Sequence, residues 1–308
     1  MNNDKLKTLD RAWLQSLPKT VCLLDQLGLL RVGGPEAEEF LNKLVSCKLE
    51  PQENQPQLCS LCNPKGRILA CFTVFYQNDA IYLQMPSELV EPTIQRLKMY
   101  MLMAKVELDD VSADLSGIGY IGFIRPKIED DSTMLQAPGH LPRYFMYAST
   151  KRIQEAWQHA MDIGYAPASY DAWHYSNIAC GIPNIYPQTI EKLTPQMVNL
   201  DLIDAVSFSK GCYPGQEVVA RTHYLGKIKR RCYLFSAASN NIKVGDPVYH
   251  PDYDEACGLV VDSYATAPNN SFALISVQVK TLNTPQLHIK TEDNQTIALQ
   301  TEEMPYIV

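Results

Sequence analysis

The feature that most constrains the fold is a change of pattern near Gly226. After this residue the chain has only short runs of alternating apolar and polar residues, separated by turn-forming residues, and no helical periodicity. This spacing is typical of a small all-β domain and predicts a barrel. Before Gly226, strand-like runs alternate with amphipathic helical patterns, as in an α+β protein. The sequence therefore predicts an α+β body followed by a β-barrel.

The α+β part repeats one order of elements. A hairpin, a strand and a helix are predicted within 57–101, and a strand and two helices within 144–179. A chain of 308 residues is long enough for two or three domains with real cores. We predict an N-terminal α+β lobe over 1–110, a second α+β lobe over 111–226 and the barrel over 227–308.

Composition excludes several protein classes. Hydrophobic residues make up 46% and charged residues 20%, which argues against disorder, collagen and coiled coil. No apolar run approaches the roughly 18 residues that span a membrane, and the start of the chain lacks the apolar segment of a secretory signal. The net charge of −7 argues against general binding to duplex DNA or anionic membranes. We expect a cytoplasmic protein without a membrane partner.

The nine cysteines are scattered and odd in number, so we predict no disulfide framework. Cys22, Cys71 and Cys232 lie in apolar, strand-like runs, where a free cysteine packs as a small hydrophobic residue. Cys59 and Cys62 have the spacing of half a zinc site, but no second pair completes four ligands. We therefore predict no metal site.

The segment Ser209–Arg231 carries the most chemical information, with six basic side chains and one acidic one. Gly211 and Gly215 flank Cys212 in a tight turn. A helix is predicted to begin at Gln216, so that its free N–H groups face the cysteine loop.

Cys212 is the candidate reactive thiol of this segment. Lys210, Arg221 and the helix N-terminus would each stabilise its thiolate. The sequence does not identify a histidine that would act as its base, so a half-buried structural thiol is the alternative interpretation.

The stretch KGCYPGQEVVAR resembles the signature of the folate-binding YgfZ family, which is related to the aminomethyltransferase T protein of the glycine cleavage system. CNPKGR at 62–67 and the Trp-bearing helix YDAWHYSNIACGIPNI also resemble the family, and the similarity touches most of 20–235. The motif positions are Lys210, Gly211, Cys212, Tyr213, Gly215, Gln216, Glu217 and Arg221.

The resemblance implies both a fold and a ligand. The fold would consist of intertwined, T-protein-like α+β lobes around a central channel, followed by a C-terminal β-barrel. The ligand would be tetrahydrofolate or a derivative. The implied role is support of tRNA modification by maintaining iron–sulfur enzymes, with a role for Cys212 in that activity.

A folate has a flat pterin, which needs a stacking partner. Trp173 is the candidate, and it shares one helical face with Asn177 and Cys180. Packing of Trp173 in the core is the alternative. A second folate-contacting position of the family falls at Leu27, where a tryptophan is expected. Both residues are therefore predicted to contact the pterin.

Two further functions remain open. A folate-dependent one-carbon transferase or demethylase, resembling aminomethyltransferase, would need an acid in 66–71, where this chain has Ala70 and Cys71. A direct tRNA-binding module would use the basic stretch 221–231. For the anionic tail of a folate, Lys210 or Arg221 is the predicted cation.

Overall fold

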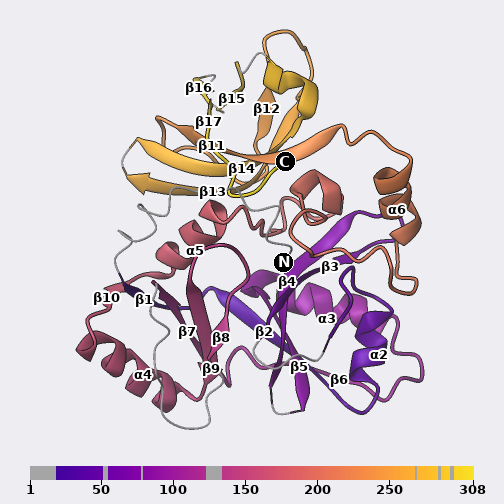
Figure 1. Cartoon of the computed structure of the whole chain (residues 1–308), viewed down its shortest axis with the longest axis vertical. Helices are drawn as coiled ribbons and strands as arrows, with labels where there is room; N and C mark the ends of the chain where they lie inside the picture. Colours follow the sequence, from indigo (N-terminus) through magenta and orange to yellow (C-terminus); the bar gives the residue numbers. More distant parts are fainter. Residues whose placement is uncertain are drawn as a thin grey trace.

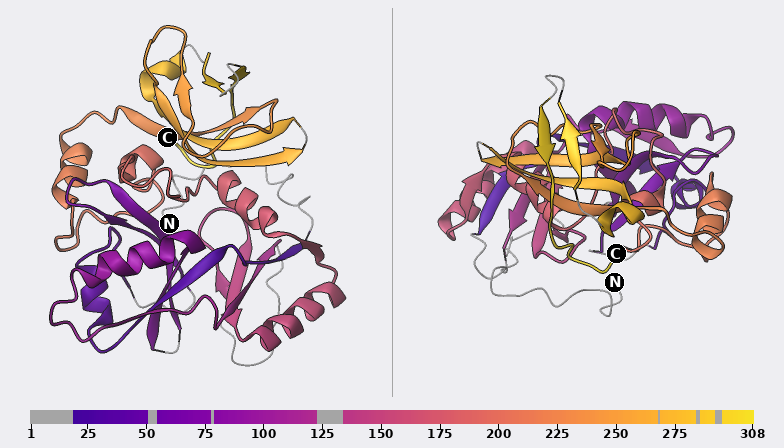
Figure 2. Two further views of the ribbon diagram at one scale, coloured as in Figure 1. Left: turned by 180° about the vertical axis from the view of Figure 1, so that it is seen from behind. Right: turned by 90° about the horizontal axis from the view of Figure 1, so that it is seen from above.

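In the computed structural model, three sheets form two α+β bodies and a β-structure that lies across both of them (Figures 1 and 2). None of the described helices is both long and apolar enough to cross a membrane. The first residues, which bear on the secretory-signal prediction, lie outside the described part. The structure describes residues 19–50, 55–77, 79–122, 134–267, 269–283, 286–291 and 295–308.

The first α+β body is built on an antiparallel sheet with the strand order β3-β4-β5-β2-β6. The predicted hairpin is confirmed, because β3 pairs with β4 around the turn that ends at Gly66. Helix α3 packs against β2, and α2 packs against β5. The elements are β2 (Leu27–Gly33), α2 (Ala37–Asn42), β3 (Gln57–Cys62), β4 (Ile68–Gln77), β5 (Ala80–Pro86), a 3-10 turn (Ser87–Leu89), α3 (Val90–Lys98) and β6 (Glu107–Asp110).

The second body has the strand order β10-β1-β7-β9-β8. Its first strand comes from the start of the chain, since β1 precedes β2 directly but pairs with β7 and β10. The two bodies are therefore intertwined, while the predicted boundary at residue 110 stays a prediction. The elements are β1 (Thr20–Leu23), β7 (Ser116–Ile121), β8 (Leu135–Gln136), β9 (Arg143–Ala148), α4 (Thr150–Asp162), β10 (Ala166–Ala168) and α5 (Tyr170–Ala179).

The C-terminal part is the predicted barrel, a nearly closed sheet of seven strands in the order β16-β15-β12-β13-β14-β11-β17. Apolar side chains of alternate positions fill its interior. A 3-10 turn (Pro195–Val198) and α6 (Gln216–Tyr224) precede it. Its elements are β11 (Arg230–Ala237), β12 (Pro247–Tyr249), β13 (Gly258–Ala267), β14 (Asn270–Gln278), a 3-10 turn (Val279–Asn283), β15 (His288–Lys290), β16 (Thr296–Ala298) and β17 (Gln300–Thr301).

A buried ion pair joins α5 to the barrel. His174 Nε2 on α5 lies 2.7 Å from Asp262 Oδ1 on β13, and the Asp262 carboxylate is fully buried. Burial by itself lowers the pKa of His174, but the charge and hydrogen bond of Asp262 outweigh it, so the pKa is raised. The pair fixes the helix that carries Trp173 against the barrel.

Candidate functional site

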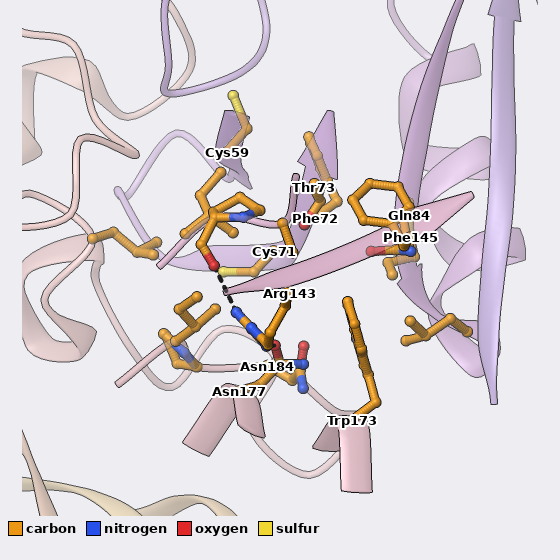
Figure 3. Close-up of a pocket in the computed structure, with 18 residues that line it drawn as sticks. Cys59, Cys71, Phe72, Thr73, Gln84, Arg143, Phe145, Trp173, Asn177 and Asn184 are labelled. Atoms are coloured by element: carbon orange, nitrogen blue, oxygen red, sulfur yellow. Dashed lines mark hydrogen bonds between the residues drawn. The ribbon is translucent and has the colours of Figure 1, made fainter. Parts of the chain in front are cut away.

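A small cavity lies between the two α+β bodies, beside Trp173 (Figure 3). Its walls come from β4 and β5 of the first body and from β9 and α5 of the second. Its volume is about 30 Å³, which accommodates one water molecule or a carbonyl group but not a ring. The lining includes Leu27, Cys71, Gln84, Arg143, Trp173 and Asn177.

A larger cavity of about 390 Å³ adjoins the small one, and the two share Leu58, Pro138 and Ile182 as lining residues. This volume falls within the roughly 300–1,000 Å³ of typical small-molecule sites. Its wall also contains Cys180 and Tyr306. The two cavities therefore lie on either side of shared wall residues, with Trp173 in the lining of the smaller one.

Trp173 belongs both to the core and to the cavity wall. The side chain is 2% exposed and packs edge-on against Phe145, with ring centroids 6.3 Å apart. A Cβ at Gly119 would lie 2.6 Å from the indole, so only glycine leaves room for it there. The predicted helical face is confirmed, because Asn177 lines the small cavity and Cys180 the larger one.

The structure also brings Leu27 to the small cavity. Leu27 is partly buried at the start of β2, directly after the turn that follows β1. Two of the predicted folate-contacting residues, Leu27 and Trp173, therefore line one cavity, although they come from different bodies.

Arg143 is the most polar group of the small cavity, and no sequence pattern pointed to it. Its side chain is 1% exposed, and its guanidinium carbon lies 5.1 Å above the Trp173 ring. It donates hydrogen bonds to Ser176 Oγ (2.9 Å), to Asn177 Oδ1 and to the carbonyl oxygen of Pro138 (2.6 Å). Its Nε has no partner among the described residues. Burial lowers the pKa of this guanidinium.

The small cavity contains no aspartate or glutamate among its described lining residues. Cys71 contributes a thiol at the place where the T-protein resemblance led us to expect an acid. Complete burial raises the pKa of this thiol well above its usual value, so it is neutral. The cavity thus lacks a carboxylate that would take up a proton.

The Cys212 motif forms a separate surface feature outside these cavities. Cys212 is exposed, and Gly215 holds a left-handed conformation (φ +81°) directly before α6. A Cβ at Gly215 would lie 2.5 Å from the carbonyl oxygen of Asn63. The motif turn is therefore packed on the hairpin turn between β3 and β4, which requires glycine at Gly215, whereas a Cβ at Gly211 would meet nothing within 4 Å.

Lys210 is turned toward backbone carbonyl groups. Its Nζ donates hydrogen bonds to the carbonyl oxygens of Val45 (2.8 Å) and Cys47 (2.7 Å), and it lies over the ring of Tyr213. Burial lowers the pKa of Lys210 to about 8. Neither Lys210 nor the exposed Arg221 lines either of the two cavities, so the structure does not bring these cations to Leu27 and Trp173.

Cys47 and Cys59 form a disulfide, although the sequence predicted no disulfide framework. Their Cα atoms are 5.2 Å apart, a usual separation for a disulfide. The expectation failed because chain folding, and not local spacing, brings the loop after α2 against β3. Cys59 lines the small cavity, so the disulfide is part of its wall.

The basic segment is less uniform than its sequence suggests. Arg231 is buried and forms two hydrogen bonds with the carboxylate of Asp201, so its charge is already paired. Arg221, Lys227 and Lys229 are not paired in this way among the described ion pairs. Among all the residues that the structure describes, no group of three or more His, Cys, Asp and Glu side chains is arranged to hold a metal ion.

Comparison with known proteins identifies the family. No family model matches the chain. A tRNA-modifying protein YgfZ from Colwellia psychrerythraea is 26% identical over 95% of both chains, and that of Buchnera aphidicola is 29% identical over 75% of this chain and 77% of the relative. An uncharacterized protein of Haemophilus influenzae is 30% identical over 69% of this chain and 71% of its own length. The chain belongs to the YgfZ family.

The fold of this YgfZ family member is that of a T protein. The crystal structure of the glycine cleavage system aminomethyltransferase T from Bartonella henselae superposes with a TM-score of 0.73 and covers 97% of this chain and 89% of that one. At 13% identity this likeness concerns the fold alone. It confirms the predicted architecture of intertwined α+β lobes with a C-terminal β-barrel.

Proposed function

We propose that this chain is a folate-binding protein that supports tRNA modification by maintaining iron–sulfur enzymes. Its relatives in the YgfZ family carry the name tRNA-modifying protein, which supports a role in tRNA modification. The fold it shares with an aminomethyltransferase T supports a folate-type ligand.

The observation that carries the ligand proposal is the pair of adjoining cavities at Trp173. The edge of a pterin enters the small cavity between Trp173 and Leu27, and the rest of the ligand occupies the 390 Å³ cavity next to it. The unpartnered Nε of Arg143 supplies a donor that such a ligand satisfies. The residues present therefore fit the edge of a flat ring that carries a hydrogen-bond acceptor.

The same cavity argues against aminomethyl transfer. That reaction needs a group that accepts or delivers a proton at the folate nitrogen. The described lining offers the neutral thiol of Cys71 and the cation of Arg143 instead of a carboxylate. We therefore propose binding of folate without this transfer reaction, and Cys212 as the thiol that acts in the supporting role.

Direct contact with tRNA is the second candidate function, and one observation favours it. Tyr224 and Leu225 are 66% and 84% exposed at the end of α6, next to Arg221 and Lys227. Exposed aromatic rings beside cations are the groups that stack on and neutralise single-stranded RNA. Binding to tRNA should weaken steeply with salt, and replacing Lys227 and Lys229 by Gln should reduce that dependence. Binding that is absent or independent of salt contradicts this candidate.

Calorimetry tests the ligand proposal. We expect saturable binding of tetrahydrofolate to the full chain, and the absence of any binding contradicts the proposal. The cellular role is tested by deleting the gene and measuring methylthio-modified nucleosides in tRNA. The intact gene should restore them and a Cys212→Ala variant should not. Full restoration by Cys212→Ala would mean that this thiol is structural.

A further inference from the structure

Arg143 is a buried cation whose described hydrogen-bond partners are all neutral. Its three acceptors are the Ser176 hydroxyl, the Asn177 amide and the carbonyl oxygen of Pro138. No carboxylate of the described residues forms an ion pair with it. Burying a charge without an anionic partner costs free energy, so an unpaired buried cation such as Arg143 indicates a functional role.

The position of the guanidinium is fixed. Three hydrogen bonds to the loop before β9 and to α5 hold it, and it lies 5.1 Å above the Trp173 ring. A planar guanidinium has five N–H donors in a rigid arrangement, so the bonds that Nη1 and Nη2 make determine where the Nε–H lies. The Arg143 side chain therefore cannot turn to a partner elsewhere, and it forms part of the wall of the small cavity.

We propose that Arg143 binds the ring carbonyl oxygen of the folate, the 4-oxo group of its pterin, and thereby selects a 4-oxo over a 4-amino ring. This inference rests on the proposed folate binding. The small cavity is about 30 Å³, which accommodates one carbonyl group, while the bulk of the ligand needs the 390 Å³ cavity beside it. The carbonyl edge of the ring therefore points inward to Arg143, next to Trp173.

The alternative source of an acceptor oxygen is the carboxylate tail of the same ligand. The site favours the ring, because the guanidinium lies against the face of an aromatic side chain and the cavity has the size of a single carbonyl group.

Three ligands distinguish these cases on the wild-type chain. Calorimetry would compare tetrahydrofolate, its 4-amino-4-deoxy analogue and 6-methyltetrahydropterin, which lacks the tail. The 4-amino group is a hydrogen-bond donor, whereas the 4-oxo group is an acceptor. Two donors cannot form a hydrogen bond with each other, so the 4-amino ring loses the bond to Arg143. We expect the 4-amino analogue to bind about 10- to 100-fold more weakly than tetrahydrofolate, the range for one lost hydrogen bond to a charged group. The tail-less pterin should still compete for the site.

The test is extended by Arg143→Lys, with Arg152→Lys as the matched control, because Arg152 is partly exposed on α4 and lines neither cavity. Arg143→Lys should bring the affinities for the 4-oxo and 4-amino rings close together, and Arg152→Lys should leave their ratio unchanged. If Arg143→Lys does not fold, the wild-type comparison decides alone.

Each remaining result contradicts the inference in its own way. Equal affinity of the wild type for the two rings overturns the role of Arg143 while folate binding stands. Binding of both tailed ligands with complete loss of the tail-less pterin shows that the tail and not the ring determines binding, and it overturns the ring assignment. Absence of binding by all three ligands overturns the proposed function together with this inference.

Discussion

Lys210 Nζ lies 2.7 Å from the carbonyl oxygen of Cys47, and Cys47 is joined by a disulfide to Cys59 on the wall of the Trp173 cavity. One hydrogen bond and one covalent bond therefore connect the lysine of the Cys212 motif with the proposed ligand site. This connection gives Lys210 a structural part in the site, although its ammonium group does not line the cavity.

Replacing Lys210 by Met should destabilise the fold. The change leaves the carbonyl oxygens of Val45 and Cys47 without a donor, and the loss of two such hydrogen bonds costs about 1–3 kcal/mol. The free energy of unfolding from urea titration measures this, with Lys227→Met at an exposed position as the control. Equal stability of the two variants would contradict the structural role of Lys210.

Thiol counting tests the cysteine arrangement. Of the seven free cysteines only Cys212 is exposed, so one thiol should react quickly with Ellman's reagent in the native protein. After unfolding without reductant the count should rise to seven, because Cys47 and Cys59 form a disulfide. In Cys212→Ala the fast reaction should disappear. Nine reactive thiols in the unreduced, unfolded protein would contradict the disulfide.

Substitutions of Trp173 should separate its core role from its ligand role. Trp173→Ala removes a buried indole and should lower the free energy of unfolding by about 3–5 kcal/mol. Trp173→Phe keeps an aromatic ring and should cost less, so it is the variant for ligand studies. Trp157→Phe on α4, which is partly buried and outside the cavity, is the control. A stable Trp173→Ala protein would contradict the packing described here.

The His174–Asp262 pair should make stability depend on pH. Because the pKa of His174 is raised in the folded state above the ordinary value of 6.5, the folded chain binds more protons than the unfolded one from about pH 6.5 upward. The stabilisation by the pair is therefore complete below that pH and is lost as pH rises through the raised pKa. Urea titrations across this range should show that the free energy of unfolding of the wild type falls as pH rises. This pH dependence should be absent from His174→Gln.

The exposed His159 provides the comparison for this slope, since His159→Gln should keep it. A His174→Gln protein with the same pH slope as the wild type would show that another group carries it.

Local patterns predicted a large part of the fold. The hairpin around Asn63 and Gly66, the helical face of Trp173 and the barrel strands follow from turn residues and periodicity, which depend only on neighbouring residues. The assignment of β1 to the second sheet was not predictable in this way. Its partners Ala166 and Ile121 lie far along the chain, and strand pairing over such distances leaves no local signal.

The candidate site was predictable to a similar extent. Leu27 and Trp173 came from family resemblance and lie together in the structure. The role of Arg143 was not predictable, because in the sequence it is only a polar residue at the start of an apolar strand. Its burial depends on how the loop at Pro138 folds over it. The carbonyl partners of Lys210 were equally unpredictable, since every residue has a backbone carbonyl group and the sequence does not indicate which ones accept a hydrogen bond.

The fluorescence of Trp173 tests the central claim most directly. The chain contains three tryptophans, so a Trp13→Phe/Trp157→Phe variant leaves Trp173 as the only emitter. Titration with tetrahydrofolate, corrected for light absorption with free N-acetyltryptophanamide, should quench this emission to saturation at one ligand per chain. Emission that stays unchanged while calorimetry detects bound folate would place the ligand elsewhere and contradict the Trp173 site.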